Sequence, residues 1–156
     1  MDEGESRAWV GLTGVLQLLP AALEAQLQRD AKLTHFEFVA LSVLRFAPGS
    51  TVRMSALATA TDSSLTRLSH VCSRLEKRGL VERFPSPQDK RATDIRLSAQ
   101  GRRELVLATP NHIANVRRLV IDVLTPEQLE SLADITETIL AQLVDDADCE
   151  AEFAGV

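Results

Sequence analysis

A basic amphipathic helix followed directly by two alternating runs limits the possible folds of this chain more than any other feature. Between Ser64 and Arg78, apolar residues recur at steps of three and four, which is the spacing of one helical face. They are Leu65, Leu68, Val71, Cys72 and Leu75, and we expect this face to point into the protein. The opposite face carries hydroxyl, imidazole and cationic side chains, which donate hydrogen bonds to phosphates and base edges. The pattern predicts a helix that reads double-stranded DNA.

The residues after this helix predict a β-hairpin with a cationic tip. Gly79 suits the left-handed conformation that ends many helices, and the two cations before it suit the negative end of the helix dipole. Two runs that alternate apolar and polar residues follow, Leu80–Phe84 and Ala92–Leu97. The segment between them, 85–91, is rich in turn-forming residues and ends in a lysine and an arginine.

A shorter helix is predicted just before the basic one. Residues 55–60 are mostly small, residues 61–63 are polar, and Ser64 can cap the helix that follows. A helix, a tight turn and a second helix form a helix-turn-helix, to which the hairpin adds a wing. The expected fold class is therefore mostly α, with a winged helix-turn-helix between N- and C-terminal helices.

Four motifs at fixed spacing connect this unit to a known family. They are Leu57-Ala58, Arg74-Leu75-Glu76-Lys77-Arg78-Gly79-Leu80-Val81-Glu82-Arg83, Asp89-Lys90-Arg91 and Leu97-Ser98-Ala99-Gln100-Gly101. With these motifs the chain resembles the MarR family of bacterial transcription regulators, over the region from Leu33 to Leu143. The resemblance implies a homodimer that binds a pseudo-palindromic operator and is released by a small-molecule effector. It also implies that Arg91 contacts DNA from the wing.

Four residues depart from the usual pattern of that family. Phe36 and Glu37 stand where proline and glutamine are usual, so the packing at this point should differ from that of relatives. Arg53 stands where a threonine or serine commonly caps the next helix, and it is placed to reach phosphate instead. Asp62 replaces a common glycine in the turn, where aspartate accepts a left-handed conformation better than most residues.

The candidate DNA-binding residues lie on the basic helix and at the wing tip. They are Ser64, Thr66, Arg67, Ser69, His70, Arg74, Lys90 and Arg91. Those in the first turns of the helix, from Thr66 to His70, should reach base edges, and Arg67 can form a bidentate contact to guanine. We expect Ser64 and Arg74 to lie nearer to the phosphates.

The wing tip carries a second set of expected contacts. We expect Arg91 to enter the minor groove and Lys90 to stay with phosphate, because a planar guanidinium suits a narrow groove better than an ammonium. Asp89 is expected to support the wing by accepting a hydrogen bond from the guanidinium of Arg91. The alternative is that the cations are simply solvated.

The net charge of −5 conceals a division between segments. From Arg53 to Arg103 there are 11 Lys and Arg against 5 Asp and Glu, whereas the rest of the chain has 6 against 17. This division places a positive surface on one module, as binding to phosphate requires, and leaves the remainder acidic.

Amphipathic helices are predicted on both sides of the reading unit. The first, residues 7–29, repeats apolar side chains at helical spacing and should bend at Pro20. Thr34 can cap a mostly buried helix that extends from His35 to about Phe46.

Two further helices follow the wing. Ser98 can cap a long helix that should bend at Pro110, and Thr125 begins a capping box for a last helix that includes Leu143. Long helices cannot each bury a wide apolar stripe on so small a domain, so we expect both chain ends to meet a second copy. The expected organisation is an N-terminal dimerisation helix (1–30), a DNA-binding domain (31–100), C-terminal dimerisation helices (101–146) and a flexible tail (147–156).

Composition bears on several other classes of protein. The apolar fraction of 45% is enough for a core in a chain of 156 residues. No apolar run approaches a membrane span and the acidic N-terminus lacks the features of a secretory signal, so we expect a cytoplasmic protein. Cys72 and Cys149 are far apart with no histidine at ligand spacing, which predicts neither a disulfide framework nor a metal site, and we expect no cofactor.

The expected function is that of a homodimeric, DNA-binding transcriptional repressor with a small hydrophobic or aromatic effector. The expected effector-binding residues are Trp9, Leu12, Leu16, His35 and Phe36. His112 is either a ligand contact or an ordinary surface residue. One alternative is an architectural DNA-binding protein without a ligand, and another is a redox-sensing regulator that uses Cys72, although a cysteine on the apolar stripe favours simple packing.

An enzyme is disfavoured. Asp62, Ser63, Ser64 and His70 are the residue types of a nucleophilic site, but they lie on one small helix and its cap. They lack a glycine-rich oxyanion turn and a nucleophile elbow.

Overall fold

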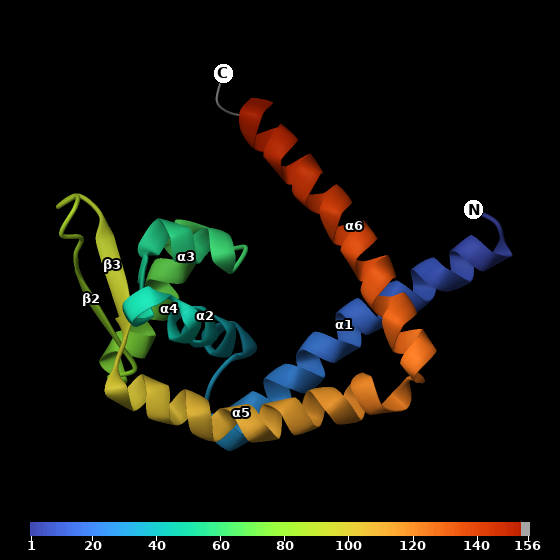
Figure 1. Ribbon diagram of the computed structural model, residues 1–156, viewed down its shortest axis with the longest axis horizontal. Helices are drawn as coiled ribbons and strands as arrows, with labels where there is room; N and C mark the ends of the chain where they lie inside the picture. The colour runs from blue at the N-terminus through green and yellow to red at the C-terminus, as the bar shows by residue number, and fades with distance from the viewer. Residues whose placement is uncertain (154–156) are drawn as a thin grey trace. The chain divides into compact units, whose positions relative to one another are not determined.

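The computed structural model describes the backbone of residues 1–153 and the side chains of residues 1–144. The chain forms two compact units, Met1–Asn115 and Val116–Val156, and each is described by itself. Figure 1 shows the elements of the first unit and labels all of its α-helices and the strands β2 and β3. The elements are α1 (Glu3–Ala31), α2 (His35–Phe46), β1 (Thr51–Arg53), α3 (Met54–Ala60), α4 (Leu65–Lys77), β2 (Val81–Pro85), β3 (Thr93–Leu97) and most of α5 (Ala99–Leu119).

The helix-turn-helix consists of α3, a tight turn and α4. Asp62 has a φ of 45°, so it adopts the left-handed conformation expected where glycine is common. Ser64 caps α4 and accepts a hydrogen bond from the backbone N–H of Arg67 at 3.2 Å. The apolar stripe of α4 is buried except at its first residue, Leu65, whose exposure of 52% shows that we were wrong to place it inside. Leu65 begins the helix, where it lines an open hollow below the wing.

The wing is part of an antiparallel sheet with the strand order β1-β3-β2. Ile95 in the central strand pairs with Val52 on one side and with Arg83 on the other. The hairpin of β2 and β3 was predicted, whereas β1 was missed because three residues are too few to show an alternating pattern. β1 ends at Arg53, directly before α3, and therefore brings this arginine to the sheet.

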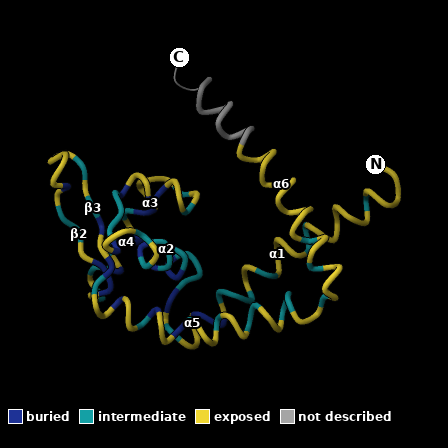
Figure 2. Tube along the Cα trace, viewed as in Figure 1, coloured by how far each residue is buried: buried dark blue, intermediate teal, exposed yellow. Residues whose placement is uncertain are grey.

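The core of the first unit is formed by the end of α1, by α2, α3 and α4, by the sheet and by the first half of α5. Figure 2 shows the buried residues concentrated in these elements. The largest fully buried side chains are Leu27, Leu33, Leu41, Leu44, Leu57, Leu68, Leu75, Leu80, Ile95, Val81 and Cys72. Each buried leucine or isoleucine contributes about 1.5–3 kcal/mol relative to an exposed one. These contacts fix α4 and the wing on one body.

The start of α2 is held by its own side chains. As predicted, Thr34 caps the helix, and its hydroxyl accepts a hydrogen bond from the N–H of Glu37 at 3.0 Å. The Glu37 carboxylate in turn accepts one from the N–H of Thr34 at 2.9 Å, which completes a capping box. Glu37 is only 4% exposed, so this first turn is a rigid element.

Helix α1 begins earlier than we predicted. Asp2 and Glu5 form a capping box, so the helix starts at Glu3 instead of Arg7. It continues through Pro20 to Ala31. The apolar side chains of its first half are exposed, including Trp9, Leu12 and Leu16.

One expectation about α1 was wrong. Its length and a window of mean hydropathy 1.3 are sufficient for a membrane-spanning helix, although we expected no run of that kind. The 18-residue window contains at most two charged residues. Length and hydropathy are also shared by helices that pack against protein.

The second unit contains a short 3₁₀ helix (Ile121–Val123) and α6 (Pro126–Phe153). The predicted capping box is present, because Thr125 and Gln128 exchange hydrogen bonds of 3.0 and 3.2 Å. The helix continues past residue 146, so residues 147–153 of the expected tail are helical. The remainder, 154–156, and the side chain of Cys149 lie outside the described residues. Exposed apolar side chains of α6 include Ile135, Leu140 and Leu143.

Candidate nucleic-acid interface

The outer face of α4 presents most of the predicted recognition residues to solvent. Ser64, Thr66, Arg67 and His70 are exposed, and Ser69 is half-buried on the side facing the wing. The exposed residues lie in the first turns of α4, the part of a recognition helix that reaches base edges. Their hydroxyl, guanidinium and imidazole groups offer the donors that base edges and phosphates accept.

The tip of the wing is a tight turn held by Asp89. The N–H of Ala92 donates to the backbone oxygen of Asp89 at 2.9 Å, and the N–H of Arg91 donates to its carboxylate at 3.0 Å. An aspartate side chain is short enough to bond the backbone two residues on, and this local bond competes with longer contacts. The predicted hydrogen bond from the Arg91 guanidinium to Asp89 is therefore replaced by one from its backbone. Lys90 and the Arg91 side chain are exposed.

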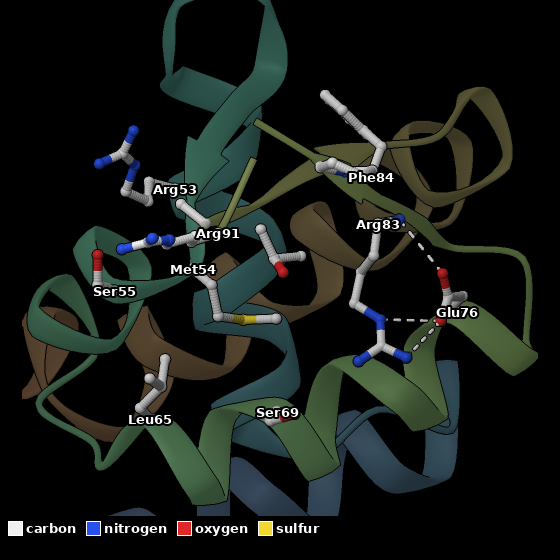
Figure 3. Close-up of a pocket in the computed structure, with 12 residues that line it drawn as sticks. Arg53, Met54, Ser55, Leu65, Ser69, Glu76, Arg83, Phe84 and Arg91 are labelled. Atoms are coloured by element: carbon white, nitrogen blue, oxygen red, sulfur yellow. Dashed lines mark hydrogen bonds and ion pairs between the residues drawn. The ribbon is translucent and has the colours of Figure 1, made fainter. Parts of the chain in front are cut away.

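A hollow of about 620 Å³ separates the wing from α4. It is lined by Arg53, Met54, Ser55, Leu65, Ser69, Glu76, Arg83, Phe84, Pro85, Arg91, Ala92 and Thr93. Figure 3 shows Arg53, Arg91 and Ser55 together at one end and the pair of Glu76 and Arg83 at the other. Arg53 and Arg91 form no ion pair within residues 1–144. We expected Arg53 to reach phosphate and did not consider Ser55. The proximity of both residues to the wing was not predicted, because it depends on the unpredicted strand β1.

The far end of this hollow is closed by an ion pair. Arg83 donates from its Nε and Nη2 atoms to Glu76 at 2.9 and 2.7 Å, and its N–H donates to the same carboxylate at 3.2 Å. Hydrogen bonds from Arg83 lower the pKa of Glu76, so this carboxylate stays ionised and paired. Consequently Arg83 ties β2 to α4 and is engaged inside the protein.

Arg74 of α4 and Arg78, the C-cap of this helix, bind the first turn of α2. The buried carboxylate of Glu37 lies 3.5 Å from Arg74 and 3.6 Å from Arg78, and Arg78 also donates to the backbone oxygen of Lys32 at 2.9 Å. Arg74, which we placed near the DNA backbone, is thus partly engaged within the protein although more than half of its side chain is exposed.

A second hollow, of about 510 Å³, lies beside the first turn of α4. It is lined by Pro20, Ala21, Glu24, His35, Phe36, Val39, Thr61 and Arg67. The structure thus brings together two of the predicted effector residues, His35 and Phe36. Trp9, Leu12 and Leu16 do not line it, because the part of α1 next to α2 is one to three turns further along the helix. The Arg67 guanidinium lies over the Phe36 ring, 4.7 Å from its centroid.

The other candidate groups are packed in the protein. His112 contacts the ring of Phe38 and lies 6.0 Å from the ring of His35; burial, with a smaller contribution from His35, lowers its pKa. Burial also raises the pKa of the Cys72 thiol to about 11, and only 1% of this residue is exposed. Within residues 1–144, no group of three or more His, Cys, Asp or Glu side chains is arranged to hold a metal ion.

Comparison with known proteins identifies this arrangement. A family model described as "MarR family" matches residues 33–93. The crystal structure of Sco3205, a MarR family transcriptional regulator from Streptomyces coelicolor in complex with DNA, covers 92% of this chain with 36% identity and a TM-score of 0.88, and this chain covers 93% of it. This chain belongs to the MarR family. AbsC, another MarR family transcriptional regulator from S. coelicolor, is similar in structure with a TM-score of 0.87, at 36% identity over 92% of this chain and 96% of AbsC.

Two curated relatives are also transcription regulators, and their matches cover a smaller part of this chain. The HTH-type transcriptional regulator YdcH of Bacillus subtilis is 36% identical over half of this chain, and the transcriptional repressor MprA of Escherichia coli is 30% identical over 68%. The matches span 54% of YdcH and 60% of MprA, less than two thirds of either protein. The named MarR-family relatives are transcription regulators, and the winged helix-turn-helix fold of this chain agrees with them.

Proposed function

We propose that this chain is a DNA-binding transcriptional regulator that represses as a homodimer on a pseudo-palindromic operator. The observation that carries the proposal is the pairing of two surfaces of one rigid unit. The exposed face of α4 supplies donors for base edges, and the hollow under the wing supplies Arg53 and Arg91 for the DNA backbone or minor groove. The named relatives include Sco3205, whose structure contains DNA.

The charge distribution supports the same reading. The segment from Arg53 to Arg103 carries the excess of cations, and it contains α3, α4 and the wing. Displacement of counterions from DNA by these cations supplies sequence-independent affinity, and α4 adds sequence readout. The acidic segments outside it disfavour other orientations on DNA.

Exposed apolar side chains support a homodimer. Within each unit considered alone, α1, α5 and α6 expose large apolar residues that a soluble chain ordinarily covers. They include Trp9, Val15, Leu16, Leu107, Ile113, Ile135, Leu140 and Leu143. Packing of these helices against a second copy covers them and presents two copies of α4 to one duplex.

We also propose that a small hydrophobic or aromatic effector weakens operator binding. The hollow beside His35 and Phe36 supports this, because it joins α1 and α2 to the first turn of the recognition helix. A molecule bound there contacts Arg67 directly. The redox alternative through Cys72 is disfavoured, because a buried thiol with a pKa of about 11 is a poor target for oxidants.

Selection of duplexes from a random library by the purified protein, followed by footprinting, tests the proposal. We expect one enriched, pseudo-palindromic sequence with half-site centres about 34 Å apart, one helical turn. Uniform recovery of all sequences would support the architectural alternative and contradict the proposal.

A further inference from the structure

Phe36 and Arg67 connect the first turns of two helices that are distant in the sequence. The guanidinium carbon of Arg67 lies 4.7 Å from the centroid of the Phe36 ring. Phe36 is half-buried and packs against the hydrophobic core, whereas Arg67 is exposed at the start of α4. The ring is therefore a fixed surface and the guanidinium is the group placed on it.

The support under Phe36 is rigid. Its neighbour Glu37 closes the capping box with Thr34 and, from a nearly buried position, pairs with Arg74 of α4 and with Arg78 at the C-cap of this helix. The N–H of His35 donates to the Glu24 carboxylate at 2.6 Å, which also ties this turn to α1. These contacts fix the distance between the Phe36 ring and the backbone of α4.

Stacking leaves the hydrogen-bonding edge of an arginine available. A guanidinium whose flat face lies over an aromatic ring keeps its five N–H donors in the plane of that face. Within residues 1–144 the Arg67 guanidinium forms neither an ion pair nor a hydrogen bond, because the only hydrogen bond that Arg67 donates is from its backbone N–H to Ser64, so its side-chain donors are not used within the described chain. A stacked guanidinium also has fewer rotamers to lose when it binds, because part of its conformational freedom is already lost.

We propose that Phe36 is a positioning residue for DNA recognition, which holds Arg67 with its donors directed to the O6 and N7 atoms of a guanine. The inference rests on the proposed DNA-binding function and adds a role to a residue of α2 that need not touch DNA.

The test is a double-mutant cycle read on two DNA duplexes. The variants are Phe36→Leu, Phe36→Tyr, Arg67→Ala and the double variant Phe36→Leu/Arg67→Ala. Dissociation constants are measured by fluorescence anisotropy for the operator selected from a random library and for a shuffled duplex of the same composition. Thermal melting followed by circular dichroism checks that each variant is folded.

Phe36→Leu removes the aromatic surface under Arg67. It should therefore raise the dissociation constant for the operator about two- to fivefold, with a smaller change for the shuffled duplex. Phe36→Tyr keeps an aromatic face and should bind the operator as the wild-type protein does. In the Arg67→Ala background, Phe36→Leu should have no further effect. If Phe36→Leu unfolds the protein, Phe36→Met provides the apolar variant for the same cycle.

Three results would overturn the inference. An equal effect of Phe36→Leu with and without Arg67 would mean that Phe36 only packs the core. Tighter operator binding by Phe36→Leu would mean that Phe36 withholds Arg67 from DNA. A wild-type protein that binds operator and shuffled duplexes equally would contradict the proposed function itself, and that result is read before any variant is compared.

Discussion

Ser98 donates a hydrogen bond from its hydroxyl to the backbone oxygen of Gly79 at 2.6 Å, and so joins the end of α4 to the start of α5. The same hydroxyl accepts a hydrogen bond from the N–H of Gly101 at 2.9 Å, and the N–H of Ser98 donates one to the backbone oxygen of Leu80. The Leu-Ser-x-x-Gly motif thus fixes the direction in which α5 leaves the wing. Its glycine is required because a Cβ at position 101 would collide with the backbone oxygen of Leu80.

The first prediction concerns that close approach. Gly101→Ala should destabilise the protein by about 1–3 kcal/mol or more, because a backbone atom, not a flexible side chain, must move. Gln100→Ala in the same turn is the matched control and should change stability by less than about 0.5 kcal/mol. Urea unfolding followed by circular dichroism measures both. Equal stability of the two variants would show that the turn relaxes freely.

The second prediction concerns the support of the wing tip. Asp89→Ala removes the acceptor for the N–H of Arg91 and should weaken operator binding, although it also removes a negative charge near DNA. Asp89→Asn removes the same charge but keeps an acceptor oxygen, so it should bind at least as well as the wild-type protein. Anisotropy titrations at one salt concentration compare them. If Asp89→Ala bound the operator more tightly than the wild-type protein, Asp89 would be only a repulsive surface charge.

The third prediction concerns Arg91 itself. Arg91→Ala should weaken operator binding by at least about 1 kcal/mol. If the side chain contacts a phosphate or lies along the minor groove, the slope of log K against log salt should also fall by about 0.9. Arg29→Ala, which removes an exposed arginine from the end of α1, is the control of equal charge. The same loss in both variants would indicate a general charge effect without a wing contact.

The fourth prediction concerns the buried thiol. With a pKa of about 11, Cys72 is almost entirely protonated at pH 8, since a group three units below its pKa is ionised to about one part in a thousand. In a Cys149→Ser background, a thiol reagent should react with Cys72 only after the protein is unfolded. Rapid reaction in the native protein, together with loss of operator binding after peroxide treatment, would restore the redox alternative.

Helix boundaries could largely be predicted from the sequence because their signals are local. Thr34, Ser64 and Thr125 all cap helices in the structure, and each lies within three residues of its hydrogen-bonding partner. Gly79 adopts a φ of 73° at the predicted end of α4. Such signals need only the nearest residues, which a single sequence contains. The capping box of Asp2 and Glu5 was present in the same way but was overlooked.

Contacts between distant elements could not be predicted in this way. Helical periodicity places Arg67 on the outer face of α4, but it does not reveal that Phe36 of α2 lies beneath its guanidinium. The predicted partner of Asp89, the guanidinium of Arg91, was wrong for a related reason. The prediction used the side-chain spacing of a strand, which does not apply once these residues form a turn. Strand β1 depends on pairing with β3, a segment more than forty residues away.

Competition between two duplexes tests the central claim most directly. A labelled operator, selected from a random library, is displaced from the protein by unlabelled operator or by a shuffled duplex at physiological salt. A regulator that reads sequence through α4 and the wing should prefer the operator by at least about a thousandfold. Equal displacement by the two duplexes would contradict sequence-specific regulation.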